Sequence, residues 1–418
     1  MAIPVRTAPR ADLPVVETPA ATRPAIVADA APSAESAILG TYKRAPMEIV
    51  GGEGVYLVDA DGRRYLDFVS GIAVNALGYG DEGLRAAMHA AADDLVHVSN
   101  LYRTAPGERL ASWLVEHSFA DKVFFCNSGA EANEGAFKIA RRWARTIGAG
   151  AKHEIISLRG AFHGRLFASL AATDRPGYRH PFRPLAPGVS IAERDIDEVA
   201  GMLDAETVAA LIVEPVQGEG GVRVLDPGFL RELRALTWER QVALVFDEIQ
   251  CGLGRTGALF AYEHSGVAPD LMTLAKPIAG GLPMGAVLMT NEMAATMKPG
   301  DHGTTFGGGP FVASVALAVC ERLADPALLD AVRENGAWLG EQLRQVAQRT
   351  GRIRQVRGTG YIWGLDVMEP SAGVIARALE AGMLVCSAGE YTIRLLPPLV
   401  ATREELARGV GILEQILS

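Results

Sequence analysis

The feature that most constrains the fold is a series of short, almost continuous apolar runs that alternate with amphipathic helical patterns. Six runs are bounded by polar residues or glycine and predict strands, at 122–126, 154–158, 209–213, 242–246, 271–274 and 285–289. Runs of this kind are typical of strands buried on both faces of a parallel sheet. Helical patterns, such as 131–144 and 229–240, lie between them. The alternation predicts an α/β fold in which right-handed crossovers place helices over a mostly parallel sheet.

The last hundred residues have a different pattern and indicate a second domain. Two helical patterns, 312–323 and 327–349, lead to apolar stretches at 356–367 and 391–396 and then to a final helix. Thr402 and Glu405 have the spacing of a capping box at the start of that helix. We therefore expect four parts, which are an Ala/Pro-rich disordered tail at 1–36, an N-terminal segment at 37–72 packed with the small domain, a large domain at 73–311 and a smaller α+β domain at 312–418.

Composition excludes several classes of protein. The net charge is −9, from 40 Lys and Arg against 49 Asp and Glu, and no basic stripe appears, so no nucleic-acid partner is expected. No apolar run approaches the ~20 residues that span a bilayer, so no membrane association is expected. The 4 cysteines are scattered without a C-x-x-C pair, which favours reduced thiols in a cytoplasmic protein with no metal site.

A strand-to-helix junction at 124–134 has the features of an anion site. An apolar run ends at Cys126, the small residues Ser128, Gly129 and Ala130 follow, and a long helical pattern begins. Free N–H groups and the positive end of the helix dipole at such a junction attract phosphate. An ordinary tight turn fits these residues equally well.

Two charged residues follow apolar runs farther along the chain. Asp247 closes the run 242–246 and is expected at the carboxyl edge of the sheet, where open α/β folds bind ligands. Its structural alternative, a helix cap, is weakened because the residues after it do not resemble a helix start. Lys276 comes just after the run 271–274, where an ammonium is costly unless it is neutralised, paired or used covalently. A solvated head group explains the remaining lysines, Lys43, Lys122, Lys138, Lys152 and Lys298.

A phosphate site, a carboxylate at a strand edge and an imine-forming lysine are the parts needed to hold pyridoxal phosphate. The carboxylate keeps the pyridine nitrogen protonated, so the ring can accept electrons from a carbanion at the substrate carbon. Other signatures are missing, since the chain has no Gly-Lys pair, no H-E-x-x-H and no G-x-S-x-G. Each signal is weak alone, and the three together predict a pyridoxal-phosphate enzyme.

Six motifs in order resemble the class III (ω-amino acid) aminotransferases, and most closely their acetylornithine aminotransferase branch. They lie at 127–133, 162–165, 214–220, 247–250, 273–276 and 302–308, and the resemblance runs from about residue 38 to the C-terminus. It implies the type I fold of pyridoxal-phosphate-dependent transferases. That fold has a large cofactor-binding domain, with a mostly parallel seven-stranded sheet between helices, and a smaller α+β domain.

The resemblance also implies roles for individual residues. Ser128, Gly129 and Ala130 would hold the cofactor phosphate, and Phe162 would stack on the pyridine ring. Asp247 would bind the ring nitrogen, and Gln250 would lie near the phenolic oxygen. Lys276 would form the imine with the cofactor and then move the proton between the substrate carbon and the cofactor. The family further implies an obligate homodimer with shared active sites, in which Thr305 reaches the phosphate of the other subunit and Thr304 its substrate.

Two arginines carry the substrate prediction. Arg165 and Arg394 can each bind a carboxylate with two parallel hydrogen bonds, and glutamate as amino donor needs both of its carboxylates held. In similar enzymes the residue at Glu219 pairs with the second arginine while the ω-amine is bound and releases it for glutamate. A surface ion pair is the structural alternative for Arg394. Arg165 would also meet the α-carboxylate of the ω-amino substrate.

Two positions depart from the family pattern. The family commonly has an aromatic residue where this chain has Arg103, near the expected mouth of the substrate site, and asparagine where it has Gly309. Arg103 leaves the acyl-group preference open. Gly309 is expected to change a loop rather than the chemistry.

Three other functions fit the sequence less well. The segment 252–257 matches G-x-G-x-x-G, but no long helix or βαβ unit follows it, which argues against a dinucleotide enzyme. An aminomutase, racemase or decarboxylase on the same scaffold would not need a switchable carboxylate clamp. A catalytically silent protein would not need both Lys276 and Asp247.

The expected function is therefore a ping-pong aminotransferase of arginine biosynthesis. It would move the δ-amino group of N2-acetyl-L-ornithine to 2-oxoglutarate and release glutamate. Ornithine, succinylornithine, succinyl-diaminopimelate or another ω-amino acid remain alternative donors.

Overall fold

The computed structural model describes residues 37–148 and 150–418. The chain divides into two units, Met1–Met47 and Glu48–Ser418, and the described helices and strands all belong to the second. The disordered tail predicted for 1–36 lies outside the described residues. Among the helices of the described residues, none is long and apolar enough to cross a membrane.

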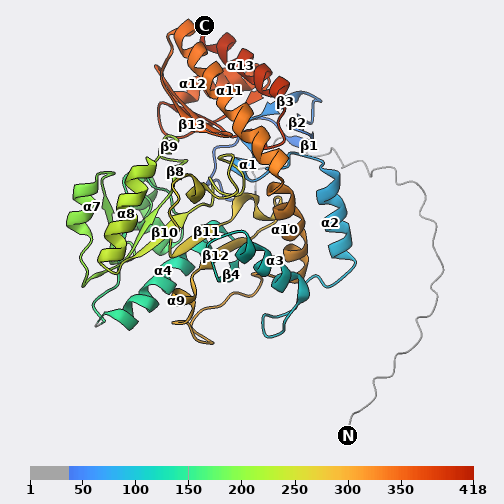
Figure 1. The fold of residues 1–418 in the computed structure, drawn as a ribbon. Helices are drawn as coiled ribbons and strands as arrows, with labels where there is room; N and C mark the ends of the chain where they lie inside the picture. Colours follow the sequence, from blue (N-terminus) through green and yellow to red (C-terminus); the bar gives the residue numbers. More distant parts are fainter. Residues whose placement is uncertain (1–36, 149) are drawn as a thin grey trace, which may run out of the picture. The chain divides into compact units, whose positions relative to one another are not determined.

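The second unit is built around a seven-stranded sheet (Figure 1). Its order is β4 (Lys122–Cys126), β12 (Gly285–Met289), β11 (Leu271–Leu274), β10 (Ala243–Asp247), β7 (Val208–Val213), β5 (Glu154–Leu158) and β6 (Val189–Ala192). The pairs from β11 to β6 are parallel, and β12 runs antiparallel to both of its neighbours. The predicted, mostly parallel sheet is confirmed.

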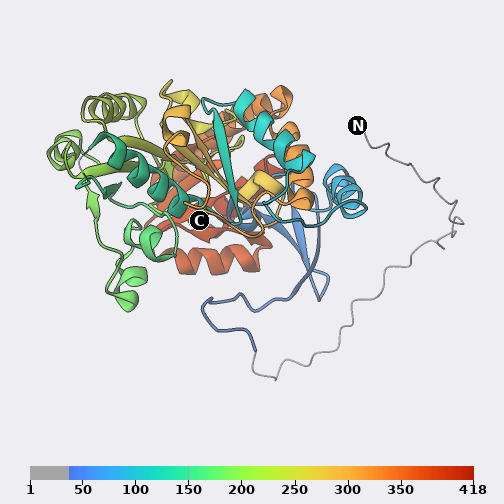
Figure 2. The same ribbon diagram turned by 90° about the horizontal axis from the view of Figure 1, so that it is seen from below.

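Helices cover both faces of this sheet (Figure 2). On one face α4 (Gly129–Ile147) buries Phe137 and Trp143 in a cluster with apolar side chains of β5 and β7. On the other face α7 (Ile196–Met202) and α8 (Pro227–Glu239) pack in a cluster around Phe246. Since β7 and β10 are buried along their whole length, their near-continuous apolar sequences follow from burial on both faces.

The C-terminal part has its own antiparallel sheet. Its order is β13 (Ile353–Thr359), β14 (Ile362–Val367), β17 (Thr392–Leu395) and β16 (Cys386–Ser387), and α11 (Pro326–Thr350), α12 (Ser371–Glu380) and α13 (Arg403–Leu417) accompany it. The predicted capping box is present, because Thr402 and Glu405 exchange side-chain-to-backbone hydrogen bonds at the start of α13. The predicted α+β character of this part is confirmed.

Strands from both ends of this unit share a third sheet. The strands β1 (Ile49–Glu53), β2 (Tyr56–Asp59) and β3 (Arg64–Asp67) form an antiparallel meander, and β15 (Met383–Leu384) adds to β3 in parallel. In Figure 1 the blue strands accordingly lie beside the orange and red elements. The boundaries of the four predicted parts stay predictions.

The remaining elements are shorter or connect these layers. They are α1 (Ser70–Ala73), α2 (Glu82–Ala92), α3 (Ala105–Glu116), α5 (Phe167–Ala171), α6 (Pro176–Arg179), the 3₁₀ turn η1 (His180–Phe182), β8 (Val216–Gln217), β9 (Arg223–Val224), η2 (Ala261–His264), η3 (Lys276–Ala279), α9 (Asn291–Ala294) and α10 (Pro310–Leu323).

The structure differs from the sequence prediction at several points. The run at 285–289 is predicted as a strand of a parallel sheet, but β12 is antiparallel to both neighbours, because burial on both faces encodes no strand direction. The strand β6 was missed, since Ser190 interrupts its short apolar run. The solvated head group expected for Lys152 was wrong. This lysine is only 2% exposed, and its ammonium donates to the carbonyls of Ala205 and Arg240.

Candidate active site

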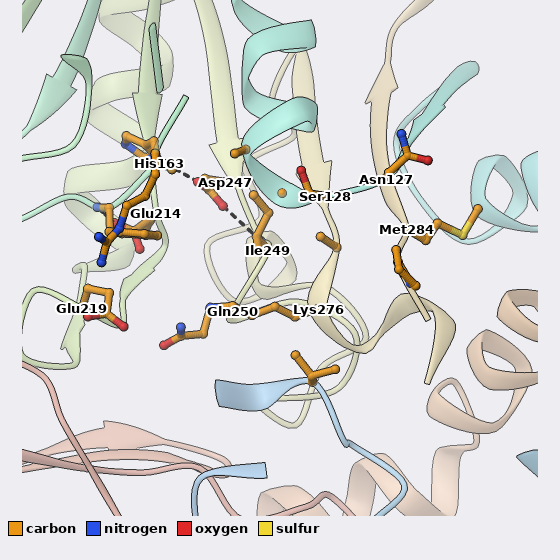
Figure 3. A pocket seen from close by; sticks show the side chains of 18 of the residues that line it. Asn127, Ser128, His163, Glu214, Glu219, Asp247, Ile249, Gln250, Lys276 and Met284 are labelled. Atoms are coloured by element: carbon orange, nitrogen blue, oxygen red, sulfur yellow. Dashed lines mark hydrogen bonds and ion pairs between the residues drawn. The ribbon is translucent and has the colours of Figure 1, made fainter. Parts of the chain in front are cut away.

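A cavity of ≈ 400 Å³ opens at the carboxyl edge of the large sheet. Four of its lining residues come directly from the ends of strands or just beyond them: Ser128 after β4, Glu214 after β7, Asp247 at the end of β10 and Lys276 after β11. Figure 3 shows these side chains converging on one space. Nine of the predicted site residues line it, namely Ser128, Gly129, Ala130, Phe162, Arg165, Glu219, Asp247, Gln250 and Lys276.

The N-terminus of α4 forms one wall of the cavity. Ser128 is the N-cap, and its hydroxyl accepts a hydrogen bond from the backbone N–H of Glu131 at 3.2 Å. The first N–H groups of a helix have no intrahelical acceptor, so those of Gly129 and Ala130 face a site suited to an anion. A side chain at Gly129 would lie 2.8 Å from Ile249, which explains why glycine occupies this position.

Asp247 is held by three hydrogen bonds. Its Oδ2 accepts from Nδ2 of Asn133 and from Nδ1 of His163, both at 2.8 Å, and its Oδ1 accepts from the N–H of Ile249 at 3.1 Å. The carboxyl group is almost fully buried. Such a network fixes the orientation of a buried carboxylate and offsets part of its desolvation.

Lys276 begins η3 immediately beyond β11. Burial, the largest effect, and the positive charge of Arg394 together lower the pKa of its ammonium to about 8, against the opposing effects of Glu219 and Asp247. Among the described residues no side chain forms an ion pair or hydrogen bond with this ammonium. A lysine with a lowered pKa and no partner is available as a nucleophile or base.

Glu214 and Phe162 also line the cavity. The carboxylate of Glu214 accepts from the N–H of Phe162 at 3.0 Å. The pKa of Glu214 is raised to about 7, mainly by burial; His163 opposes this shift and the negative charge of Asp247 adds to it. Phe162 is half-buried and contacts Tyr178 edge to face.

Arg394 lies in the interior and forms an ion pair with Glu219. It is 1% exposed, so the surface ion pair considered as its alternative is wrong. One terminal nitrogen donates to Oε1 of Glu219 at 2.5 Å, and the other donates to Oε1 of Gln250 at 2.9 Å. Its Nε is buried without a hydrogen-bond partner among the described residues. The guanidinium therefore retains a free N–H donor, and its charge is neutralised by the partly exposed carboxylate of Glu219.

Arg165 reaches the cavity from the segment after His163. It is exposed, and its guanidinium lies over the ring of Tyr178 at 3.6 Å from the centroid. Stacking of this kind orients a guanidinium while leaving its donors free for a carboxylate.

Thr304 and Thr305 do not reach this cavity. The hydroxyl of Thr304 accepts from Asn127 Nδ2 at 3.1 Å, and Thr305 is exposed. Thr304 lines a separate surface pocket together with Arg103, whose side chain is 94% exposed and lies 3.9 Å from Glu108. Gly309, the other departure from the family pattern, is the N-cap of α10.

The sequence interpretation assigned no role to the residues that support Asp247. Asn133, on α4, also donates to the carbonyl of His163 and accepts from Thr273 Oγ1 on β11. The Nε2 of His163 is buried without a partner in the described part of the chain. The available signal was that both Asn133 and His163 are polar residues inside the motifs at 127–133 and 162–165. The G-x-G-x-x-G segment at 252–257 forms turns, as the argument against a dinucleotide site requires.

The chain is similar to known aminotransferases over almost its whole length. A family model described as aminotransferase class-III matches residues 40–417. The acetylornithine aminotransferase of Gloeobacter violaceus is 46% identical over 387 residues, which cover 92% of this chain and 96% of that protein. The crystal structure of the ornithine aminotransferase from Toxoplasma gondii has a TM-score of 0.86 and 31% identity, covering 91% of this chain and 92% of that one. The N-acetylornithine aminotransferase from Stenotrophomonas maltophilia has a TM-score of 0.79 and 36% identity, covering 90% and 96%.

Proposed function

The chain belongs to the class III aminotransferases, and on this premise we propose that it transfers the δ-amino group of N2-acetyl-L-ornithine to 2-oxoglutarate. The reaction is a ping-pong cycle that yields glutamate, within arginine biosynthesis. The observation that carries the proposal is the convergence of Lys276, Asp247 and the Glu219–Arg394 pair at one cavity and its wall.

The residues of the cavity fit pyridoxal phosphate. The α4 N-terminus suits its phosphate, the buried and hydrogen-bonded Asp247 suits a protonated ring nitrogen, and Phe162 offers an aromatic face. Lys276 is the amine that would bind it covalently, and Gln250 lies on the same wall. When bound, this cofactor supplies a reactive aldehyde and an electron-accepting ring.

The side chains then have distinct tasks. Lys276 Nζ removes and returns a proton at the substrate carbon that carries the amine, and its lowered pKa leaves much of it neutral near pH 8. Asp247 holds a proton on the ring nitrogen, while Asn133 and His163 keep its carboxylate in place. Arg165 binds the α-carboxylate of the ω-amino substrate.

The Glu219–Arg394 pair distinguishes the two substrates. While an ω-amine is bound, Glu219 pairs with the guanidinium, so the region presents little net charge to a reacting carbon that carries no carboxylate. When glutamate or 2-oxoglutarate enters, Arg394 exchanges Glu219 for the substrate carboxylate. Glu219 is the side chain free to leave, since its carboxylate is 22% exposed whereas Arg394 is enclosed.

The proposed assembly is a cytoplasmic homodimer with shared active sites. Thr304 and Thr305 lie away from the cavity of their own chain, and the neighbouring Phe306, Leu101 and Tyr102 expose large apolar side chains. A second subunit that covers these residues would receive Thr305 at its cofactor phosphate and Thr304 at its substrate.

The donor is tested by half-reactions of the purified holoenzyme. N-acetylornithine, ornithine, succinylornithine and succinyl-diaminopimelate are compared as amino donors, and N-acetylornithine is expected to react fastest. Lys276→Ala should reduce turnover by at least ~10²-fold. Faster turnover of free ornithine would reject the acetylated donor, and undiminished turnover by Lys276→Ala would reject the mechanism.

Ornithine is the second candidate donor. The Toxoplasma gondii ornithine aminotransferase has a higher TM-score than the Stenotrophomonas maltophilia enzyme, 0.86 against 0.79, but a lower identity, 31% against 36%. We favour the acetylated donor because the relative at 46% identity is an acetylornithine aminotransferase.

A further inference from the structure

A second pocket, of ≈ 690 Å³, lies beside the loop that carries Glu219. Its wall combines residues of the β8–β9 hairpin, of β13 and of β17 with Arg175, and it shares no lining residue with the cavity of Lys276. The strand β9 lies against β13 where the small sheet approaches the large one (Figure 1). Three of the lining residues are arginines, Arg175, Arg223 and Arg354, and we call this space the arginine pocket.

In the described part of the chain the three arginines form no close ion pairs, although the positive charge of Arg223 helps to lower the pKa of Asp366 in the same pocket. Within residues 37–148 and 150–418 no carboxylate lies within ion-pair distance of any of them. Arg223 Nε donates to the carbonyl of Gly220 at 3.1 Å, and Arg354 donates to the carbonyl of Val367 at 3.1 Å. Each guanidinium has five N–H donors, and each of the three makes one hydrogen bond to a carbonyl, so most of their donors have no acceptor among the described residues.

The acidic residue that lines the pocket is already paired. Both oxygens of Asp366 accept from Arg357 at 2.6 Å, and Oδ1 also accepts from Thr392. Nearby, burial and the positive charges of Arg223 and Arg357 lower the pKa of Arg194, and their effect outweighs the opposing charge of Glu193. The surroundings therefore carry a surplus of positive charge that favours an anion.

We propose that the arginine pocket binds a small dicarboxylate. Arg175 and Arg223 bind carbonyls of the Glu219 loop and Arg354 lies on β13, so three cationic side chains from separate segments line one space. A planar guanidinium binds a carboxylate with paired hydrogen bonds, and two carboxylates match this distribution. The choice of a dicarboxylate over other anions rests on the proposed function, since 2-oxoglutarate and glutamate both belong to this class.

An anion in this pocket would affect the Glu219–Arg394 pair through the backbone of the Glu219 loop. The carbonyls of three successive residues, Glu219, Gly220 and Gly221, accept from Arg175, Arg223 and Arg357 respectively. A bound carboxylate competes with the first two carbonyls for guanidinium donors. Occupancy of the pocket thereby loosens the loop from which Glu219 holds Arg394 and favours exchange of Glu219 for a substrate carboxylate.

The test is titration calorimetry of the holoenzyme with succinate, a dicarboxylate that lacks both an amine and a keto group. Two bound succinates per chain are expected, one at the active site and one in the arginine pocket. The double variant Arg223→Gln/Arg354→Gln should weaken one of them by at least ~tenfold. Arg394→Gln should weaken the other. Arg352→Gln, which removes an exposed charge close by in the sequence, is the matched control and should leave both sites unchanged.

Several outcomes would overturn the proposal. One succinate per chain would do so, as would a double variant that retains both affinities or a control that loses the same site. Equal or tighter binding of inorganic phosphate or acetate at the second site would reject the dicarboxylate class. The double lysine variant, Arg223→Lys/Arg354→Lys, should recover part of the affinity. Donor turnover tests the proposed function separately, because it does not depend on how many succinates bind.

Discussion

At the residue scale, the ammonium of Lys276 is held in a cavity that disfavours its charge. Its folded-state pKa of about 8 lies below the ordinary value of 10.5, so between these values the unfolded chain binds a proton that the folded chain does not. The cost to stability is therefore fully present below pH 8 and disappears as the pH rises to 10.5. The same cost is what makes the amine reactive.

The cofactor-free protein should accordingly be stabilised by Lys276→Met. At pH 7 we expect a gain of up to ~3 kcal/mol in the free energy of unfolding, which shrinks above pH 8 and approaches zero near pH 10.5. Urea unfolding of both proteins across this pH range measures it. A difference that does not change with pH would contradict the lowered pKa.

Gly218 leaves room for the side chain that supports Arg394. A Cβ at this position would overlap Oε1 of Gln250, which accepts from Arg394. Gly218→Ala should displace Gln250 and so remove its hydrogen bond to the charged Arg394. Because one such bond is lost, we expect the KM for glutamate to rise by about tenfold. Steady-state kinetics checks this, with Gly177→Ala as the control because no atom lies near a Cβ there. Equal effects of the two substitutions on this KM would contradict the role of Gln250 in supporting Arg394.

At the element scale, the two glycines of α13 show how packing rather than propensity decides a helix. Gly409 is buried, and a Cβ there would lie 2.6 Å from the ring of Phe68, so the helix packs closely on the N-terminal strands. A Cβ at Gly411 would meet no atom. Both glycines cost helix stability in isolation, but only the first is needed for contact.

The two positions should therefore respond in opposite directions to alanine. Gly411→Ala should stabilise the protein by about 0.5–1 kcal/mol, through helix propensity alone. Gly409→Ala should destabilise it by about 1–3 kcal/mol, because the added methyl group overpacks the core. Denaturant midpoints of the two variants test these opposite effects. Stabilisation by both substitutions would mean that α13 does not pack closely against Phe68.

At the scale of the whole molecule, the proposed shared sites predict complementation between subunits. Lys276→Ala and Thr305→Ala chains, each impaired alone, would form one intact site in every mixed dimer. Random mixing makes about half of the dimers mixed, so activity should rise to about a quarter of the wild-type value. Activity is measured after mixed refolding and compared with each variant refolded alone. No rise above the separate variants would refute sites that are shared through Thr305.

The alternation of apolar runs and helical patterns determined the α/β class, because burial on both sheet faces leaves a periodicity that can be read directly. Lys276 and Asp247 were identified for a related reason. A charged group at the end of a buried apolar strand is costly unless it is paired or used chemically. Only the tertiary structure decided which side chains support them. Asn133 and His163 meet Asp247 across more than 80 positions of sequence, and local pattern carries no information on such contacts. It also decided the direction of β12 and the burial of Lys152 and Arg394, because these depend on what packs against a residue rather than on its neighbours in the chain.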